Sequence, residues 1–358
     1  MILFDYKIFF LQKYGGISRY FIELFKKFDQ NNIDYLLQVS IHQNYYLKIN
    51  SIKKSKNIHL NNYPKYTRKM IESINNYFFL KKIKSEKFKI IHNTYYGNNI
   101  LNQDKTIITS VYDFTHEIFS DEFNYSKNIK KNSIKNSNHF ICISENTKND
   151  LIKFYNINEK NISVIYLGGD HLPKSNFTFE SKPFVLYVGY RENYKNFEIL
   201  LKSFYESDKL KNDFDIICYG SNKFTKNELS KIQKYGLLDK VKHMAGDDQL
   251  LSNLYSSAKC HVITSRYEGF GITAIEAYNF GCPVILNNSS SLKEVGTKTN
   301  SFEGSSEQLK ILLEKTLYSE EFSDEIKNIG EKFKKKFSWN NCYKETIKVY
   351  EKFLPTKL

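Results

Sequence analysis

Short apolar runs alternate with longer amphipathic stretches along nearly the whole sequence, and this alternation restricts the folds open to the chain. Continuous apolar runs of about four to eight residues are typical of strands buried on both faces. Strands that alternate with helices predict α/β units with mainly parallel sheets. The stretch 162–183 loses the pattern and carries two glycines and two prolines, so we expect a linker there. The sequence therefore predicts two doubly wound domains.

The expected elements divide into two series of similar size, which suits a chain of 358 residues. From about residue 323 a helical tail follows, longer than the second series needs. In the first series we expect strands at 2–5, 34–40, 89–93, 106–113 and 139–144, with helices at 17–29, 65–82, 126–137 and 145–155. In the second we expect strands at 184–190, 215–220, 240–246, 260–265 and 282–288, with helices at 195–207, 225–236, 248–258 and 272–280.

The apolar opening MILFDYKIFFL is interrupted by Asp5 and Lys7, so we expect a strand and not a signal peptide. No apolar run approaches the roughly 18 residues that cross a bilayer. Five scattered cysteines without a CxxC pair favour buried thiols over a disulfide or zinc framework. The sequence thus predicts a cytoplasmic protein.

The formal net charge of +14 comes almost wholly from lysine, because only four of the 53 basic residues are arginine. Where arginine does occur, a planar fork that lysine lacks is a reason for its use. The segment 48–89 holds twelve basic and two acidic residues, interleaved with aromatic and aliphatic ones. Such a segment is typical of a surface for anionic lipid or nucleic acid, or of a solvated lysine-rich helix face.

The stretch SRYEGFGITAIEAYNFGCPVI has the form of a glycine loop between a strand and a helix. Gly269 and Gly271 allow close approach of a ligand to the backbone. The amides from Phe270 to Thr273, including those of Gly271 and Ile272, then point at the ligand with the helix dipole behind them, which favours a phosphate.

Two glutamates, Glu268 and Glu276, flank this anion site. A carboxylate repels a phosphate because both are anionic, but it accepts hydrogen bonds well from paired hydroxyls. Glu276 leans toward the start of its helix, where it can meet a ribose diol. Glu268 can do the same for a sugar at the far end of a diphosphate. The alternative is that both are surface acids.

The second series opens with YVGYRENYKNF, in which Gly189 ends a strand and Arg191 and Lys195 precede a helix. Two cations at such a position can clamp a diphosphate, although an ordinary cationic loop is the alternative. Gly15 and Gly16 open a further helix start in the first series, aimed at a cleft between the domains. Neither the loop with Gly189 nor the helix start at Gly15 and Gly16 has a Walker or GxGxxG pattern.

These motifs together resemble the GT-B-fold retaining glycosyltransferases of family 4, marked by two glutamates separated by seven residues. GGISRYFIEL, VYDFTHE, ICISENTKNDLIKFY, ISVIYLGGD, VGYRENYKNF and EGFGITAIEAYNFGCPVI carry the resemblance. The family's fold has two Rossmann-like domains with a cleft between them. The resemblance implies an acceptor-side domain at 1–168, a nucleotide-sugar domain at 169–338, and a helix at 339–358 packing back across the first.

The resemblance also implies roles for the motif residues. Arg191 and Lys195 would neutralise the donor diphosphate, Glu276 would hold the ribose and Glu268 the donor sugar. Gly16 would let its loop close over the donor. Many relatives carry a His-Asp pair where this chain has Tyr112-Asp113, so Asp113 and His116 are acceptor-side candidates. DFD at 213–215 precedes its strand, at the wrong end for a ligand site, so we expect no metal and no cofactor.

The expected function is transfer of a hexose, with mannose from GDP-mannose as the best match, to a growing lipid-linked glycan in polysaccharide or lipopolysaccharide synthesis. The basic segment 48–89 would then hold the enzyme on the inner membrane face. A UDP-sugar donor, an epimerase and a phosphorylase of the same fold are alternatives. A basic nucleic-acid- or membrane-binding protein without catalysis is a rival from another class, and scarce arginine speaks against nucleic acid as a partner.

Overall fold

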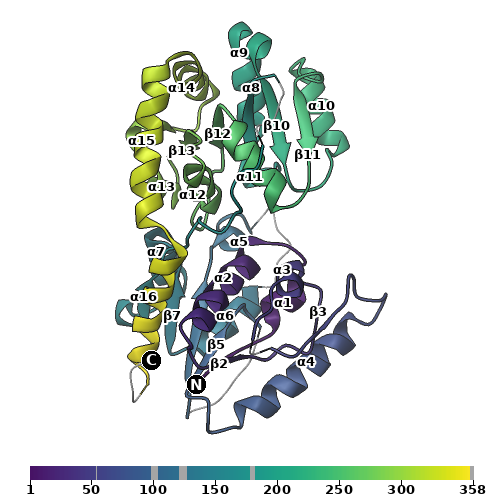
Figure 1. Cartoon of the computed structure of the whole chain (residues 1–358), viewed down its shortest axis with the longest axis vertical. Coiled ribbons are helices and arrows are strands. Elements are labelled where there is room, and N and C mark those ends of the chain that lie inside the picture. The colour runs from purple at the N-terminus through teal and green to yellow at the C-terminus, as the bar shows by residue number, and fades with distance from the viewer. Residues whose placement is uncertain (54, 98–103, 121–126, 178–181, 355–358) are drawn as a thin grey trace. The chain divides into compact units, whose positions relative to one another are not determined.

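A computed structural model of the chain describes residues 1–53, 55–97, 104–120, 127–177 and 182–354. The chain divides into two compact units, which we call unit 1 (residues 1–167 and 339–358) and unit 2 (residues 168–338) (Figure 1). Lys54 of the basic segment, residue 126 of an expected helix, residues 178–181 of the expected linker and the last four residues of the tail lie outside the described residues.

Unit 1 is built on a parallel sheet whose strands pair in the order β2-β1-β5-β6-β7-β8. A separate short pair, β3-β4, lies outside this sheet. The strands are β1 (Ile2–Phe4), β2 (Tyr35–Leu37), β3 (Ile41–His42), β4 (Ile58–His59), β5 (Ile90–Asn93), β6 (Thr106–Val111), β7 (His139–Cys142) and β8 (Ile162–Val164). The helices are α1 (Lys7–Leu11), α2 (Gly16–Gln30), α3 (Tyr45–Ile49), α4 (Arg68–Ile83), α5 (Thr115–Ile118), α6 (Lys127–Lys135), α7 (Glu145–Tyr155) and α16 (Trp339–Glu351).

Aromatic side chains fill the core between β1 and α2. The Phe4 ring packs edge-on against Phe25 at 4.9 Å, and Phe25 stacks on Tyr35 at 5.1 Å. Each of these side chains is buried. Aromatic pairs in such geometries add to the stabilisation from area burial alone, so this cluster fixes α2 on the sheet.

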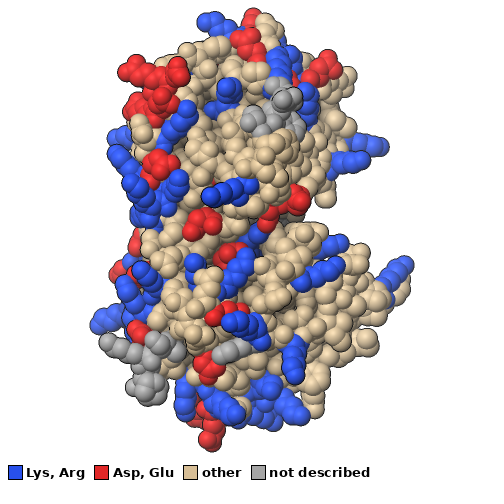
Figure 2. All heavy atoms as spheres, viewed as in Figure 1, with Lys and Arg blue, Asp and Glu red and all other residues tan. Residues whose placement is uncertain are grey.

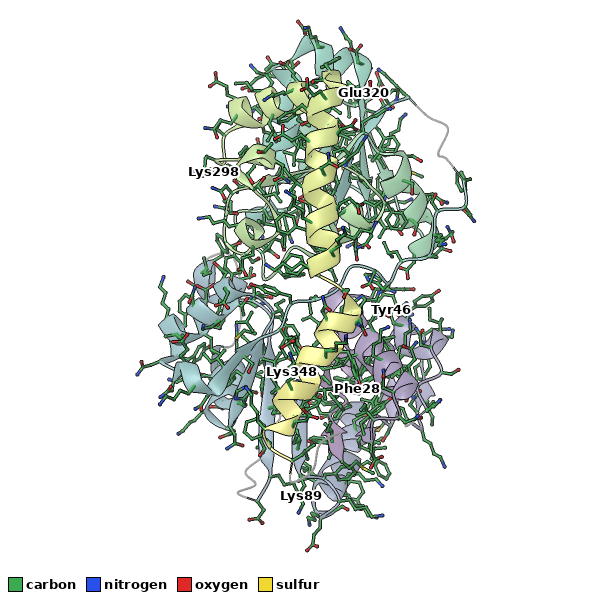
Figure 3. All side chains as sticks on the ribbon, turned by 60° about the vertical axis from the view of Figure 1, so that its left-hand side comes forward. Phe28, Tyr46, Lys89, Lys298, Glu320 and Lys348 are labelled. Atoms are coloured by element: carbon green, nitrogen blue, oxygen red, sulfur yellow. The ribbon has the colours of Figure 1, made fainter. Side chains whose placement is uncertain are left out.

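The tail helix α16 belongs to unit 1 and packs on α2. Trp339 stacks on Tyr20 at 6.2 Å, and the Tyr350 hydroxyl lies 2.6 Å from Nδ1 of His92. Figure 3 shows α16, marked by Lys348, running beside the helix that carries Phe28. Burial lowers the pKa of His92 to about 3, so this histidine is a neutral core residue that ties β5 to α16.

Unit 2 is a second parallel sheet, with strand order β11-β10-β9-β12-β13-β14. Its strands are β9 (Phe184–Val188), β10 (Asp215–Tyr219), β11 (Val241–Met244), β12 (Cys260–Ile263), β13 (Val284–Asn287) and β14 (Ser301–Phe302). Its helices are α8 (Glu198–Tyr205), α9 (Asp208–Asp213), α10 (Lys226–Lys234), α11 (Asp248–Ser257), α12 (Ile272–Asn279), α13 (Leu292–Val295), α14 (Ser306–Tyr318) and α15 (Glu320–Lys336).

The fold class expected from the sequence is confirmed, since both units are doubly wound parallel sheets. Two local expectations are wrong. The apolar opening is a strand only as far as Phe4, after which Lys7–Leu11 turns into α1. The stretch expected to be a linker begins with β8, whose three residues pair with β7. A strand of three residues is too short to show an alternating pattern of apolar and polar side chains.

Candidate functional site

The strand order of unit 2 reverses direction at β9, which marks one position at the carboxyl edge of the sheet. From β9 the chain winds to β10 on one side, and β12 lies on the other side of β9. Ligands of open α/β sheets bind beyond the carboxyl ends of the strands at this kind of switch point. The loops after β9 and β12 are joined there, because Arg266 N donates to Tyr194 O at 2.7 Å and Thr264 Oγ1 donates to Lys195 O at 2.6 Å.

Lys195 and Glu268 face each other across this junction. Lys195 Nζ lies 2.6 Å from Glu268 Oε1, and each side chain is 19% exposed. Ser265 Oγ donates to the same carboxylate oxygen at 2.6 Å. The backbone of Glu268 is held as well, since its amide donates to Ser290 Oγ at 2.8 Å. The structure thus brings together one cation and one acid from segments 73 residues apart.

The glycine loop after β12 ends at a residue with a left-handed backbone. Gly271 caps α12 with φ of 94°, a left-handed conformation in which side chains are strained, and a Cβ there would lie 2.8 Å from Leu292 Cδ2. The Phe270 ring packs edge-on against Phe337 at 5.3 Å, inside unit 2. In the first turn of α12 the Ala274 amide donates to the Gly271 carbonyl at 3.0 Å. The amides that precede Ala274 are at the start of the helix, where backbone donors suit an anion.

Glu276, one turn into α12, is buried and held at both carboxylate oxygens. Oε1 lies 3.2 Å from His171 Nε2, and Oε2 accepts from the Tyr255 hydroxyl at 3.0 Å. Burial, together with the nearby carboxylate, raises the pKa of Tyr255 well above its usual value, so Tyr255 remains a donor. The carboxylate is thereby fixed in one orientation, with lone pairs left for a ligand.

His171 and Tyr255 did not stand out in the sequence, because their partner is apparent only in three dimensions. His171 reaches Glu276 because Gly169 lets its segment lie directly on α12. A Cβ on Gly169 would come within 2.7 Å of the Ile275 carbonyl carbon. The adjacent glycines 168 and 169 before His171 were the one sequence signal of this approach.

Arg191, for which the sequence predicts contact with a diphosphate, has protein partners in the structure. Its Nε donates to Glu228 Oε1 at 2.6 Å, and its Nη2 donates to the Asn222 carbonyl at 2.7 Å. Its guanidinium also lies over the Phe224 ring at 4.8 Å. Burial alone would raise the pKa of Glu228, but the Arg191 hydrogen bond and the capping bonds to Thr225 lower it. Arg191 therefore joins the loop after β9 to the start of α10.

The other predicted glycines lie directly after β9 and at the start of α2. Gly189 directly follows β9 with φ of 109°, and its amide donates to Tyr219 O. Gly15 precedes α2, and a Cβ there would collide with Gln12, whose side chain accepts from the Ser18 amide. Gly16 is the first residue of α2, and a Cβ there would meet nothing within 4 Å.

Asp113 and His116 lie together at α5 in unit 1. Asp113 Oδ1 accepts from the Thr115 amide at 3.0 Å, and its carbonyl accepts from Lys130 Nζ at 2.5 Å. His116 lies within α5 itself.

Comparison with known proteins identifies the family. The model of Glycosyltransferase Family 4 matches residues 14–171, and that of the glycosyl transferases group 1 matches residues 170–333. The chain belongs to the GT-B glycosyltransferases of family 4. Gly269 to Ile272 and both glutamates lie within the second match, and Gly15, Gly16, Asp113 and His116 within the first.

Two curated relatives of this family 4 member are mannosyltransferases by name. O-antigen chain mannosyltransferase B of Escherichia coli is 24% identical over 249 residues, covering 64% of this chain and 65% of that protein. O-antigen chain mannosyltransferase RfbU of Salmonella typhimurium is 32% identical over 180 residues, covering 48% of each. The chain thus spans less than two thirds of the length of these relatives.

A solved structure, Anabaena HepE in complex with UDP and glucose, has the same fold. Its TM-score is 0.73 at 16% identity, over 98% of this chain and 99% of that one. Within the described residues of this family 4 chain, no three His, Cys, Asp or Glu side chains are grouped to hold a metal ion. None of its described helices is both long and apolar enough to cross a membrane.

Proposed function

We propose that the chain is a retaining glycosyltransferase that moves a hexose from a nucleotide sugar to a growing, lipid-linked glycan without a metal ion. The observation that carries this proposal is the cluster at the β9–β12 switch point, where Lys195, Glu268 and the start of α12 meet. Mannose from GDP-mannose is the favoured donor because of the two relatives named as mannosyltransferases. A UDP-sugar is the alternative, since HepE has been crystallised with UDP and glucose.

In this proposal the donor lies along the carboxyl edge of unit 2. The loop amides of Phe270, Gly271 and Ile272 and the Lys195 ammonium hold the diphosphate. Glu276, fixed by His171 and Tyr255, accepts from the ribose hydroxyls, and Glu268 accepts from hydroxyls of the donor sugar. Arg191 acts indirectly, as a residue that positions the loop after β9.

The chemical step needs charge stabilisation and no protein nucleophile. The bond from the sugar C1 to the phosphate oxygen breaks, and a bond from C1 to the acceptor oxygen forms on the same face. The acceptor proton passes to the departing phosphate oxygen. Lys195 and the α12 amides stabilise the negative charge that grows on the nucleoside diphosphate. Asp113 and His116 are the acceptor-side residues of this proposal.

Binding of one class of nucleoside diphosphate is the expected result of a thermal-shift panel. Purified chain is mixed with GDP, UDP, ADP and their common sugars, and unfolding is followed by fluorescence. A ligand that binds only the folded state stabilises it by about 2.7 kcal/mol at 100 times its Kd. Nucleotides of one base should therefore raise the Tm of the protein more than nucleotides of the other bases do. If no nucleotide changes the Tm, the switch-point cluster is not a donor site.

We further propose that the exposed face of α4 binds anionic membrane. Its large apolar side chains Met70, Tyr77 and Phe78 are exposed beside the exposed Lys81 and Lys82. Figure 2 shows lysine and arginine side chains gathered at the end of unit 1 where α4 leads into β5, the end marked by Lys89 in Figure 3. Apolar side chains ringed by lysines suit the interface of an anionic bilayer.

Flotation on phosphatidylglycerol-rich vesicles at low salt tests this surface. We expect the wild-type chain to float with the vesicles, and Lys81→Gln/Lys82→Gln to lower the partition coefficient about 10- to 30-fold, since each lysine near an anionic surface contributes about 1 kcal/mol. The matched control is Lys332→Gln/Lys335→Gln on α15, where both lysines are also exposed. Equal binding by both double variants would exclude α4 as the contact.

A further inference from the structure

The loop after β13 binds the backbone of Glu268 on both sides of its side chain. The Glu268 amide donates to Ser290 Oγ at 2.8 Å, and the Glu268 carbonyl accepts from Ser291 Oγ at 2.8 Å. Ser291 is fully buried, so water does not compete for its bond. These two hydroxyls therefore fix the direction in which the Glu268 side chain leaves the backbone.

The same loop, residues 287–291, also holds the chain three residues before Glu268, and we call it the serine loop. The Ser265 carbonyl accepts from Asn287 Nδ2 at 3.0 Å and from Ser289 Oγ at 2.9 Å. The Ser265 hydroxyl in turn donates to Glu268 Oε1 at 2.6 Å. The serine loop thus holds the segment that carries Glu268 at both ends, and through Ser265 it also holds the carboxylate.

The backbone and the packing of the serine loop indicate a rigid support. Ser290 has φ of 45°, a left-handed conformation that residues other than glycine rarely adopt. Such conformations persist only where the surrounding structure imposes them. Helix α13 follows the loop directly, and its Leu292 and Val295 are fully buried. A Cβ on Gly271 would lie 2.8 Å from Leu292 Cδ2 and 3.3 Å from Val295 Cγ2, so α13 packs directly on the glycine loop.

The contact of Glu268 with Lys195 is not suited to position this carboxylate while a donor is bound. In the structure Lys195 Nζ and Ser265 Oγ both donate to Glu268 Oε1, each at 2.6 Å. A bound diphosphate would compete for the lysine ammonium, because phosphate oxygens are strong acceptors of charge-assisted hydrogen bonds. Once Lys195 turns to the diphosphate, the bonds to Ser265, Ser290 and Ser291 remain to hold Glu268.

The Glu268 carboxylate keeps one oxygen for a ligand. Within the part of the chain that the structure describes, its bonds to Lys195 and Ser265 both go to Oε1. An ionised carboxylate has about four lone-pair positions on its two oxygens, so Oε2 retains the capacity to accept from sugar hydroxyls. Its direction is then set by the serine contacts, which hold the rest of the residue.

We propose that the serine loop positions Glu268 for recognition of the donor sugar, with Ser290 and Ser291 as the positioning residues. This inference deepens the proposed function and rests on it, because it takes Glu268 as the acceptor of the sugar hydroxyls. The serines themselves make no contact with the ligand. Their loss should therefore weaken binding of the sugar part of the donor and leave binding of the nucleoside diphosphate part unchanged. A loop that only stabilises the fold would change both or neither.

Calorimetric titration of the full chain separates these two roles. The probes are GDP, GDP-mannose, UDP and UDP-glucose, and the variant is Ser290→Gly/Ser291→Ala. Glycine relieves the left-handed strain at position 290, so we expect a folded variant, which thermal unfolding checks. For the base that wild type binds, the variant should keep the wild-type Kd for the nucleoside diphosphate. It should bind the sugar nucleotide about tenfold more weakly, as expected when a hydrogen bond to a charged group is lost.

A Glu268→Gln background shows whether the serines act through Glu268. This substitution removes the charge and should itself weaken binding of the sugar nucleotide about tenfold. Adding Ser290→Gly/Ser291→Ala should then weaken binding no further, because groups that act through one shared residue are not additive. The matched control, Ser301→Ala, removes a serine hydroxyl of β14 that donates to the Thr297 carbonyl at 2.6 Å, and it should leave every Kd unchanged.

The outcomes distinguish failure of this inference from failure of the proposed function. A wild-type chain that binds neither GDP-mannose nor UDP-glucose contradicts the proposed donor site, and the positioning role falls with it. If wild type binds one of them and the serine variant binds it equally well, the positioning role alone is contradicted. Equal losses for the nucleoside diphosphate and the sugar nucleotide, or a further loss in the Glu268→Gln background, would also overturn it, because the serine loop would then only stabilise the fold.

Discussion

Arg191→Ala is expected to lower the free energy of unfolding by about 3–5 kcal/mol, because it leaves the buried Glu228 carboxylate without its cation. Glu228 is buried, and its bonds to Arg191 lower its pKa below the usual value. Urea unfolding of the purified variant, followed by circular dichroism, measures the loss. Breaking one partner of a buried pair is costly even where the intact pair contributes little.

Two further variants make this result specific. Arg191→Met/Glu228→Gln removes both charges and keeps an amide that can cap α10 at Thr225, so a large part of the stability should return. Lys231→Ala breaks the exposed pair with Glu198, in which both side chains are about 40% exposed, and should cost less than about 1 kcal/mol. An Arg191→Ala protein of wild-type stability that no longer binds nucleotide would instead restore Arg191 as a diphosphate ligand.

The main contact of Arg191 could not be predicted from the sequence. The scarcity of arginine correctly suggested a need for its planar fork, but the partner could not be identified. That partner, Glu228, lies 37 residues along the chain. It reaches Arg191 only because β10 pairs directly with β9. Local sequence contains no signal of which strands are neighbours, so a cation after a strand could equally serve a ligand or the protein.

The local chemistry of the glycine loop was easier to predict. Gly271 has a left-handed backbone, and this requirement is visible in the residue type itself. Glu276 lies one turn into its helix, as its spacing indicated. The sequence did not predict that His171 and Tyr255 would hold both oxygens of that carboxylate, because these contacts join a loop, α11 and α12.

The fold could be predicted where the elements are long or fully buried. The runs at β6 and β7 and the helix α7 are found close to their expected bounds. The short strands β3 and β4 have only two residues each and were not expected. Their pairing is stabilised by tertiary contacts, among them Asn75, which accepts from the amides of Ser40 and Ile41. Such contacts override weak local preference.

Loss of ribose recognition is the second large effect that we expect. Glu276 is the one predicted hydroxyl acceptor that is both buried and fixed, and hydrogen bonds to a charged acceptor contribute about 1.5–3 kcal/mol each. The Glu276→Ala variant should therefore bind a nucleoside diphosphate about 10- to 100-fold more weakly than wild type. In the proposed site Lys195 contacts the diphosphate instead, so its removal should weaken binding of nucleotides with and without ribose hydroxyls alike.

Calorimetric titration tests this central claim most directly. The nucleoside diphosphate with the largest thermal shift and its 2′,3′-dideoxy form are titrated into wild type, Glu276→Ala and Lys195→Met, each first shown to be folded. We predict that wild type and Lys195→Met prefer the ribose form by about 10- to 100-fold, that Lys195→Met binds both forms more weakly, and that Glu276→Ala has no preference. A Glu276→Ala protein that keeps the wild-type preference would contradict the assignment of this site.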